Sequence, residues 1–246
     1  MTALLPLVTG VLAGFFLALA VSWLPKSIEQ EEAEWIAAVT EKDVPTERIS
    51  FLDHCRENSW FSRDSVVLAV LCALLSLGVA IRYGADLSNH EKLFGSAMPL
   101  KVWSLMIFGW GMLALAMIDF KTRFLPDALT QPLLWLGLLF QLSQQTATVG
   151  IESAVLGATL GYILLWLSAQ VFLLVRRQEG LGRGDMKLMA VVGAWLGPLA
   201  VPMVLFIGAC LGLIWQLIAI TRGKAKTQDA FAFGPWLIVG ALIYMF

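Results

Sequence analysis

Residues 3–24 read ALLPLVTGVLAGFFLALAVSWL, an apolar run without a single charged side chain. About 20 such residues form a helix long enough to cross a bilayer, where no water satisfies an exposed backbone. No Lys or Arg precedes the run, so it lacks the basic start of a cleavable signal peptide. We therefore expect this segment to be a retained membrane span.

Further apolar runs cover residues 65–81, 102–118, 128–142, 151–175, 186–200, 202–220 and 235–246. Pro198 and Pro202 flank the junction between two of them, which gives eight helices if the chain breaks there and seven if it does not. Hydrophobic residues make up 59% of the 246 residues and charged residues 14%, against about 25% charged in soluble domains. The sequence predicts an all-α, polytopic membrane helix bundle of about eight transmembrane helices.

The basic residues predict how this bundle is oriented. With eight spans, alternate loops on one side hold fourteen of the seventeen Lys and Arg residues. Because basic loops stay in the cytoplasm, that side is expected to be cytoplasmic and the N-terminus periplasmic. The formal net charge of −1 argues against nucleic acid as a partner and leaves membrane lipid as the expected surroundings.

Three segments are expected along the chain: a first transmembrane helix (1–24), an acidic cytoplasmic loop (25–64) and a seven-helix membrane core (65–246). The loop carries ten acidic and five basic residues, and a helix is expected near 28–42. Its acidic side chains either face solvent or attract a basic partner at the membrane surface.

Apart from the acidic residues of this loop, few side chains of the chain are suited to catalysis or metal binding. His54 and His90 are the only histidines, and three cysteines without a CxxC pair encode neither a zinc site nor a disulfide framework. Three aspartates remain at the expected cytoplasmic ends of helices: Asp119, Asp127 and Asp185. Ionisable groups at membrane depth are costly and usually functional. Asp119 and Asp185 fall on the same side of the bilayer, which suggests an aspartic acid–base pair.

Asp127 and Asp185 lie in different local sequences. Asp127 follows Pro126 at a helix start, where an N-cap role is favoured over a catalytic one. Asp185 ends the stretch Gly180-Leu181-Gly182-Arg183-Gly184-Asp185, whose glycines imply a positive φ or a close approach of another chain. A phosphate-binding loop is disfavoured there, because no strand precedes it and no Walker spacing follows.

Two long segments and a short one carry a family resemblance. They are Ala116-Met117-Ile118-Asp119 with Leu125-Pro126-Asp127-Ala128-Leu129-Thr130, then Gly182-Arg183-Gly184-Asp185-Met186-Lys187-Leu188, and finally Phe233-Gly234-Pro235. Their order and separation resemble those of the type IV prepilin peptidases, integral membrane aspartic proteases of the GxGD type. The resemblance covers about 100–246 well.

The resemblance implies an enzyme of the bacterial inner membrane that removes the basic leader peptide of type IV prepilins or type II secretion pseudopilins at the cytoplasmic face. Asp119 and Asp185 would be the catalytic pair, with no metal and no cofactor needed for proteolysis. Gly182 and Gly184 would let an extended substrate lie along the backbone. Lys187 either balances local charge or snorkels toward solvent, and the pilus or secretion machinery is a further possible partner.

The front of the chain departs from the family. Ala18 and Trp23 replace an asparagine and an arginine, and the loop 25–64 has only Cys55 where most bacterial members carry two CxxC pairs that bind zinc. The family's second activity, N-methylation of the new amino terminus with S-adenosylmethionine, is associated with this front part and stays open here. A proton-coupled transporter and an inactive assembly scaffold are the alternative functions.

Overall fold

The computed structural model describes residues 4–40, 63–87, 100–143, 146–177, 182–222 and 232–246. Its helices group into two compact units, residues 1–77 and 78–246, and each is described by itself. Within the described ranges the regular secondary structure is entirely α-helical, which confirms the predicted all-α class.

The first unit contains α1 (Leu4–Thr40) and the larger part of α3 (Arg63–Leu87). The two helices meet at small residues. A Cβ on Gly10 would lie 2.6 Å from the Cα of Ala73, and a Cβ on Gly14 would lie 2.7 Å from the backbone nitrogen of Ala69. Such small-residue contacts let membrane helices approach closely, so that van der Waals packing holds them together.

α1 does not end where its apolar run ends. The helix continues through Pro25 to Thr40, so the helix expected near 28–42 is the second half of α1 rather than a separate element. The residues after Pro25 are rich in Glu and Ala, which are good helix formers regardless of hydropathy. The apolar run therefore ends at residue 24 because the surroundings of the helix change there, while the backbone stays helical. Residues 41–62, the rest of the acidic loop, lie outside the described residues.

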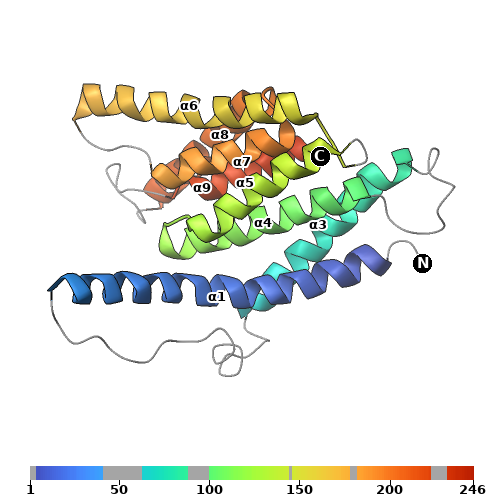
Figure 1. Cartoon of the computed structure of the whole chain (residues 1–246), viewed down its shortest axis with the longest axis horizontal. Helices are drawn as coiled ribbons and strands as arrows, with labels where there is room; N and C mark the ends of the chain where they lie inside the picture. The colour runs from blue at the N-terminus through green and yellow to red at the C-terminus, as the bar shows by residue number, and fades with distance from the viewer. Residues whose placement is uncertain (1–3, 41–62, 88–99, 144–145, 178–181, 223–231) are drawn as a thin grey trace. The chain divides into compact units, whose positions relative to one another are not determined.

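The second unit holds six further helices, which are α4 (Leu100–Thr122), α5 (Asp127–Leu142), α6 (Ile151–Arg176), α7 (Arg183–Leu196), α8 (Ala200–Thr221) and α9 (Gly234–Met245) (Figure 1). The eight helices of the described ranges match the eight apolar runs one for one. The chain breaks between α7 and α8, where Gly197 has a φ of +83° and Pro198 follows. A positive φ is inexpensive only for glycine, and it explains why these runs are two helices.

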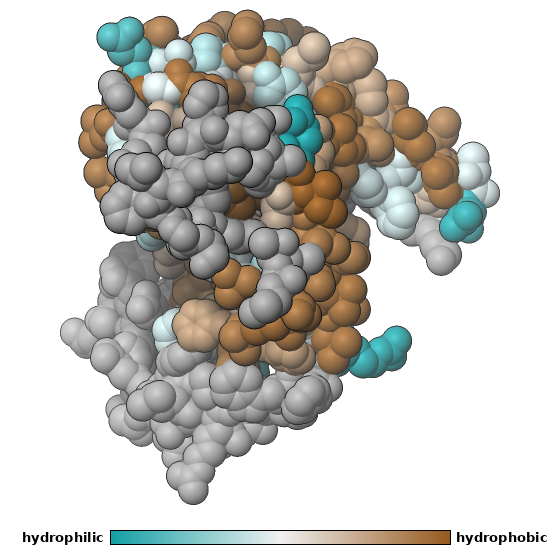
Figure 2. Space-filling view, turned by 90° about the vertical axis from the view of Figure 1, so that its right-hand side faces the viewer, coloured by the Kyte–Doolittle hydropathy of each residue, from teal (hydrophilic) through white to brown (hydrophobic). Residues whose placement is uncertain are grey.

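Five of these helices are long and apolar enough to cross a bilayer: α1, α3, α4, α6 and α8. α5, α7 and α9 are shorter, with 16, 14 and 12 residues. Many large apolar side chains are nevertheless exposed, as on α6, where Leu174 is 80% exposed. On the face drawn in Figure 2, apolar residues make up much of the described surface. An exposed apolar surface of this kind is expected of helices that face lipid.

α7 is the central helix of the second unit and contacts α5, α6, α8 and α9. Against α6 it packs through glycines, since a Cβ on Gly157 would lie 2.9 Å from the carbonyl carbon of Gly193 and would collide with its oxygen. Against α5 it packs through Trp195, which is 1% exposed and donates its indole N–H to the Leu133 carbonyl at 2.8 Å. These contacts fix α7 on two sides.

The glycine contact between α6 and α7 yields a stability prediction. Gly157→Val should lower the free energy of unfolding by about 1–3 kcal/mol, because the new side chain overpacks a helix crossing. Thr159→Val is the matched control, because it places the same side chain at an exposed position of α6 and should change stability by less than about 0.5 kcal/mol. Denaturant unfolding in detergent measures both, and equal stability of the two variants would contradict the packing described here.

Candidate active site

Asp119 lies in the last turn of α4, on the side of the helix that faces the protein. Its side chain is 5% exposed, and the preceding Ile118 is fully buried. The backbone carbonyl of Asp119 accepts a hydrogen bond from the Arg123 N–H at 2.8 Å, where the chain leaves the helix with a φ of +54° at Arg123. Asp119 therefore lies on the buried face of α4, at the end of the helix, and its carboxylate points into the protein.

Asp185 lies in the first turn of α7, three residues after Gly182, which is the N-cap. Its side chain is 8% exposed. Its own N–H donates to the Gly182 carbonyl at 3.2 Å. The first turn of a helix favours a negative charge, because the helix dipole is positive at that end. The helix start therefore suits a carboxylate at this position.

The two carboxylates meet beside Gly234, the first residue of α9. A Cβ on Gly234 would collide with Oδ2 of Asp119 and would lie 3.2 Å from Oδ1 of Asp185. α9 contacts both α4 and α7, so three helix ends converge at this point. The structure thus brings together two aspartates that are 66 residues apart in the sequence.

The electrostatics of this pair favour a shared proton. Both side chains are buried, and both carboxylates lie next to Gly234. Oδ2 of Asp119 is buried without a hydrogen-bond partner among the described residues. Two carboxylates this close cannot both be ionised without a large repulsion, so they titrate as a coupled pair. One protonated and one ionised carboxyl, side by side, form an acid and a base in a single site.

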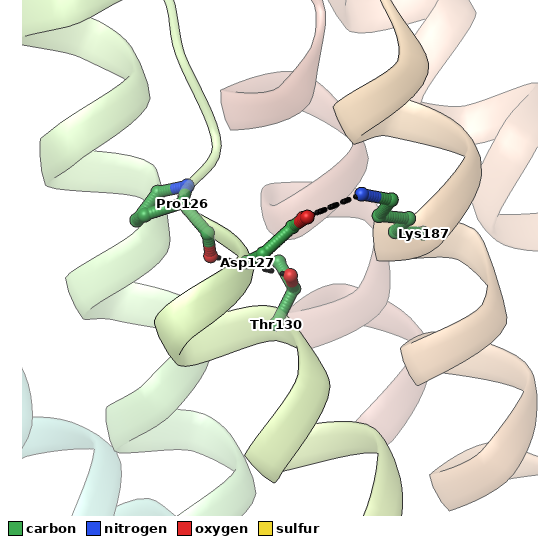
Figure 3. Close-up of polar contacts among 4 residues, drawn as sticks. All are labelled: Pro126, Asp127, Thr130 and Lys187. Atoms are coloured by element: carbon green, nitrogen blue, oxygen red, sulfur yellow. Dashed lines mark hydrogen bonds and ion pairs between the residues drawn. The ribbon is translucent and has the colours of Figure 1, made fainter. Parts of the chain in front are cut away.

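Asp127 and Lys187 form an ion pair at the edge of the site (Figure 3). The Lys187 ammonium donates to both carboxylate oxygens of Asp127 at 2.6 Å, with side chains that are 32% and 59% exposed respectively. The expectation that Asp127 is an N-cap is wrong by one position: Pro126 is the N-cap, and Asp127 is the first helical residue. Lys187 is the charge partner of Asp127 and does not simply snorkel, because α5 and α7 begin side by side.

Neither site glycine has a positive φ. Gly182 has an extended backbone with φ of −68° and ψ of 140°, and Gly184 is helical. A Cβ on Gly184 would lie 2.8 Å from Cβ of Leu125, which is 6% exposed. Of the two reasons expected for these glycines, the close approach of another segment holds for Gly184, and the segment is the link between α4 and α5.

Gly234 is the residue of the site that sequence reasoning did not single out. Its signal was present in Phe233-Gly234-Pro235, which carried part of the resemblance without a role being assigned to it. No spacing rule places the start of a last helix against two aspartates from α4 and α7. Within the described ranges no group of three His, Cys, Asp or Glu side chains is arranged to hold a metal ion, and His54 and Cys55 lie outside those ranges.

Comparison with known proteins shows which family the chain resembles. The sequence profile of the type IV leader peptidase family matches residues 106–217. The chain is 35% identical over 245 residues to the prepilin leader peptidase/N-methyltransferase of Escherichia coli (strain K12). The alignment covers 99% of this chain and 96% of that protein. A protein of the same name from Stutzerimonas stutzeri is 29% identical over 96% of this chain and 88% of its own length.

A third relative matches more locally. The prepilin leader peptidase/N-methyltransferase of Burkholderia pseudomallei (strain 1026b) is 40% identical over 169 residues, 68% of this chain and 53% of that protein. No solved structure matches the chain.

Fold and site together define a multi-pass, all-helical membrane protein with a buried pair of aspartates at one end of its bundle. The chain belongs to the type IV leader peptidase family, and it is a peptidase. The family expected from the two aspartate segments is thereby confirmed.

The ion pair at the edge of the site yields a second prediction. Asp127→Asn, Lys187→Met and the double variant should show a coupling free energy below about 1 kcal/mol, because both side chains are partly solvated and salt screens the pair. Unfolding of the four proteins in detergent measures the coupling. A coupling above about 2 kcal/mol would mean that the pair is effectively buried and would contradict the exposure described here.

Proposed function

We propose that this protein is an aspartic endopeptidase that removes the basic leader peptide of type IV prepilins or type II secretion pseudopilins. The observation that carries the proposal is the meeting of Asp119 and Asp185 beside Gly234, with Oδ2 of Asp119 buried and unpartnered. A buried pair that shares one proton suits peptide hydrolysis, and the relatives whose names specify prepilin leader peptidase supply the substrate class.

The proposed chemistry uses water as the nucleophile. The ionised carboxylate takes a proton from water while the oxygen attacks the scissile carbonyl carbon, and the protonated carboxyl donates its proton to the carbonyl oxygen. The tetrahedral gem-diol then collapses: the carbon–nitrogen bond breaks, the amine leaves with a proton, and the product carboxylic acid is released. The pair ends with one proton, as it began, and no covalent intermediate forms.

The position of the pair fits a substrate cut at the end of a membrane helix. Asp119 is in the last turn of a helix that is long enough to span the bilayer, and Asp185 is in the first turn of another. A prepilin carries a short basic leader followed by an apolar helix, so its cleavage point lies at the membrane boundary. With the basic loops on the cytoplasmic side, we place the cleavage at the cytoplasmic face of the inner membrane.

N-methylation of the new amino terminus is the second candidate activity. It is favoured by the match to the Escherichia coli relative, whose name includes N-methyltransferase and which aligns with 99% of this chain. S-adenosylmethionine would be the methyl donor. The loop 25–64 has only Cys55 where most bacterial members carry two CxxC pairs, and its residues 41–62 lie outside the described residues.

The function is tested by co-expressing a type IV prepilin with the wild type, Asp119→Asn or Asp185→Asn and measuring the prepilin by intact mass. Each substitution should lower cleavage by at least about 1,000-fold, because an amide cannot exchange the proton that the acid–base pair must pass. The same spectrum shows methylation of the product as a gain of about 14 Da, the mass that a methyl group adds in place of a hydrogen.

Glu152→Gln is the matched control, because it removes an exposed carboxylate from the first turn of α6, at the other end of the bundle. It should cleave like the wild type. Cleavage that survives either aspartate substitution at the wild-type level would remove the pair from the mechanism. Uncut prepilin with the wild type would instead favour a transporter or a scaffold.

A further inference from the structure

The start of α9 forms the third wall of the site, and its first residue has no side chain. We propose that Gly234 is a positioning residue for the reaction: the missing side chain lets the Asp119 and Asp185 carboxylates stand close enough to act as a pair. The inference rests on the proposed function, because it assigns a role within that same site.

Two independent observations meet at Gly234. A Cβ there would collide with Oδ2 of Asp119, and it would lie 3.2 Å from Oδ1 of Asp185. Oδ2 of Asp119 is also the one buried side-chain oxygen of the described residues that lacks a hydrogen-bond partner. An unpaired buried carboxylate oxygen costs stability, so its presence here indicates a functional role. The two carboxylates therefore occupy the space that a side chain at position 234 would fill.

α9 cannot easily withdraw to make room for a side chain. It is also packed against α8, where a Cβ on Gly208 would lie 3.1 Å from the Cα of Leu237 and a Cβ on Gly240 would lie 2.9 Å from the Val204 carbonyl oxygen. Leu237 is fully buried. Backbone-to-backbone contacts of this kind leave no flexible side chain to yield, so α9 behaves as a fixed wall.

The carboxylates are the part that can move. The residues that flank them in sequence, Ile118 and Met186, are 0% and 5% exposed, so the backbones of α4 and α7 are anchored on both sides of the site. Rotating a side chain disturbs fewer contacts than shifting a packed helix. A methyl group at position 234 should therefore turn the Asp119 carboxylate away from Asp185 and leave the fold in place.

Kinetics separate this positioning role from a structural one. Wild type, Gly234→Ala, Gly240→Ala and Asp119→Asn are purified in detergent and assayed with the same prepilin. Gly234→Ala should lower kcat by about 100-fold, because a misplacement of about 1 Å between reacting groups costs that much. KM should change by less than about threefold, because the substrate surface is intact.

Gly240→Ala is the matched control: it adds a methyl group to the same helix, against backbone, but away from the carboxylates. Its kcat should fall by less than about threefold while its Tm drops at least as far as that of Gly234→Ala. Wild-type kcat in Gly234→Ala, or equal losses of kcat in both variants, would overturn the inference. If Asp119→Asn still cleaves, the proposed function fails instead, whatever Gly234→Ala does.

A thermal-stability cycle decides the matter if Gly234→Ala is too unstable to assay. Gly234→Ala is made in the wild type and in Asp119→Ala, which removes the carboxylate that the new methyl group would strike. The loss of Tm should be smaller in the second background, because residues in contact are not additive. An equal loss in both backgrounds, or failure of both proteins to fold, would overturn the inference and show that α9 needs Gly234 for its own packing.

Discussion

The close approach of helices at glycines is the constraint on which the rest of the structure depends. Lipid offers no hydrophobic drive for one helix to associate with another, so packing at short range holds the bundle together. Gly157 and Gly193 bring α6 onto α7, Gly184 admits Leu125 beside α7, and Gly208 brings α9 onto α8. A glycine on one side of each contact lets the other segment come close, and the ends of α4, α7 and α9 meet as a result.

That packing turns two ordinary aspartates into a pair. Asp185 alone is a carboxylate in a first turn, where the helix dipole favours a negative charge, and Asp119 alone is a carboxylate in a last turn, where the dipole disfavours it. Held together out of water, two carboxylates repel each other when both are ionised, which favours a single proton shared between them. The exposed Asp127 on the next helix instead pairs with Lys187.

The helices and the two aspartates could be predicted from the sequence because each has a local signal. Apolar runs predicted the eight described helices, and Pro198 and Pro202 marked the junction between α7 and α8. The continuity of α1 through Pro25 was missed, because hydropathy reports the solvent of a helix and not where its backbone ends. Gly234 was missed because its importance depends on helices distant in sequence, and the Asp127–Lys187 pair was missed because α5 and α7 start side by side only once folded.

The meeting of Asp119 and Asp185 is the central claim, and thiol cross-linking tests it most directly. In a chain whose native cysteines are replaced, Asp119→Cys and Asp185→Cys are combined and treated with a short bifunctional thiol reagent, and joined peptides are measured by mass spectrometry. Rapid cross-linking is expected between the cysteines at positions 119 and 185. No cross-linking is expected between Asp119→Cys and Glu152→Cys, which lie at opposite ends of the second unit. Joining of the control pair alone, or of neither pair, would contradict the site.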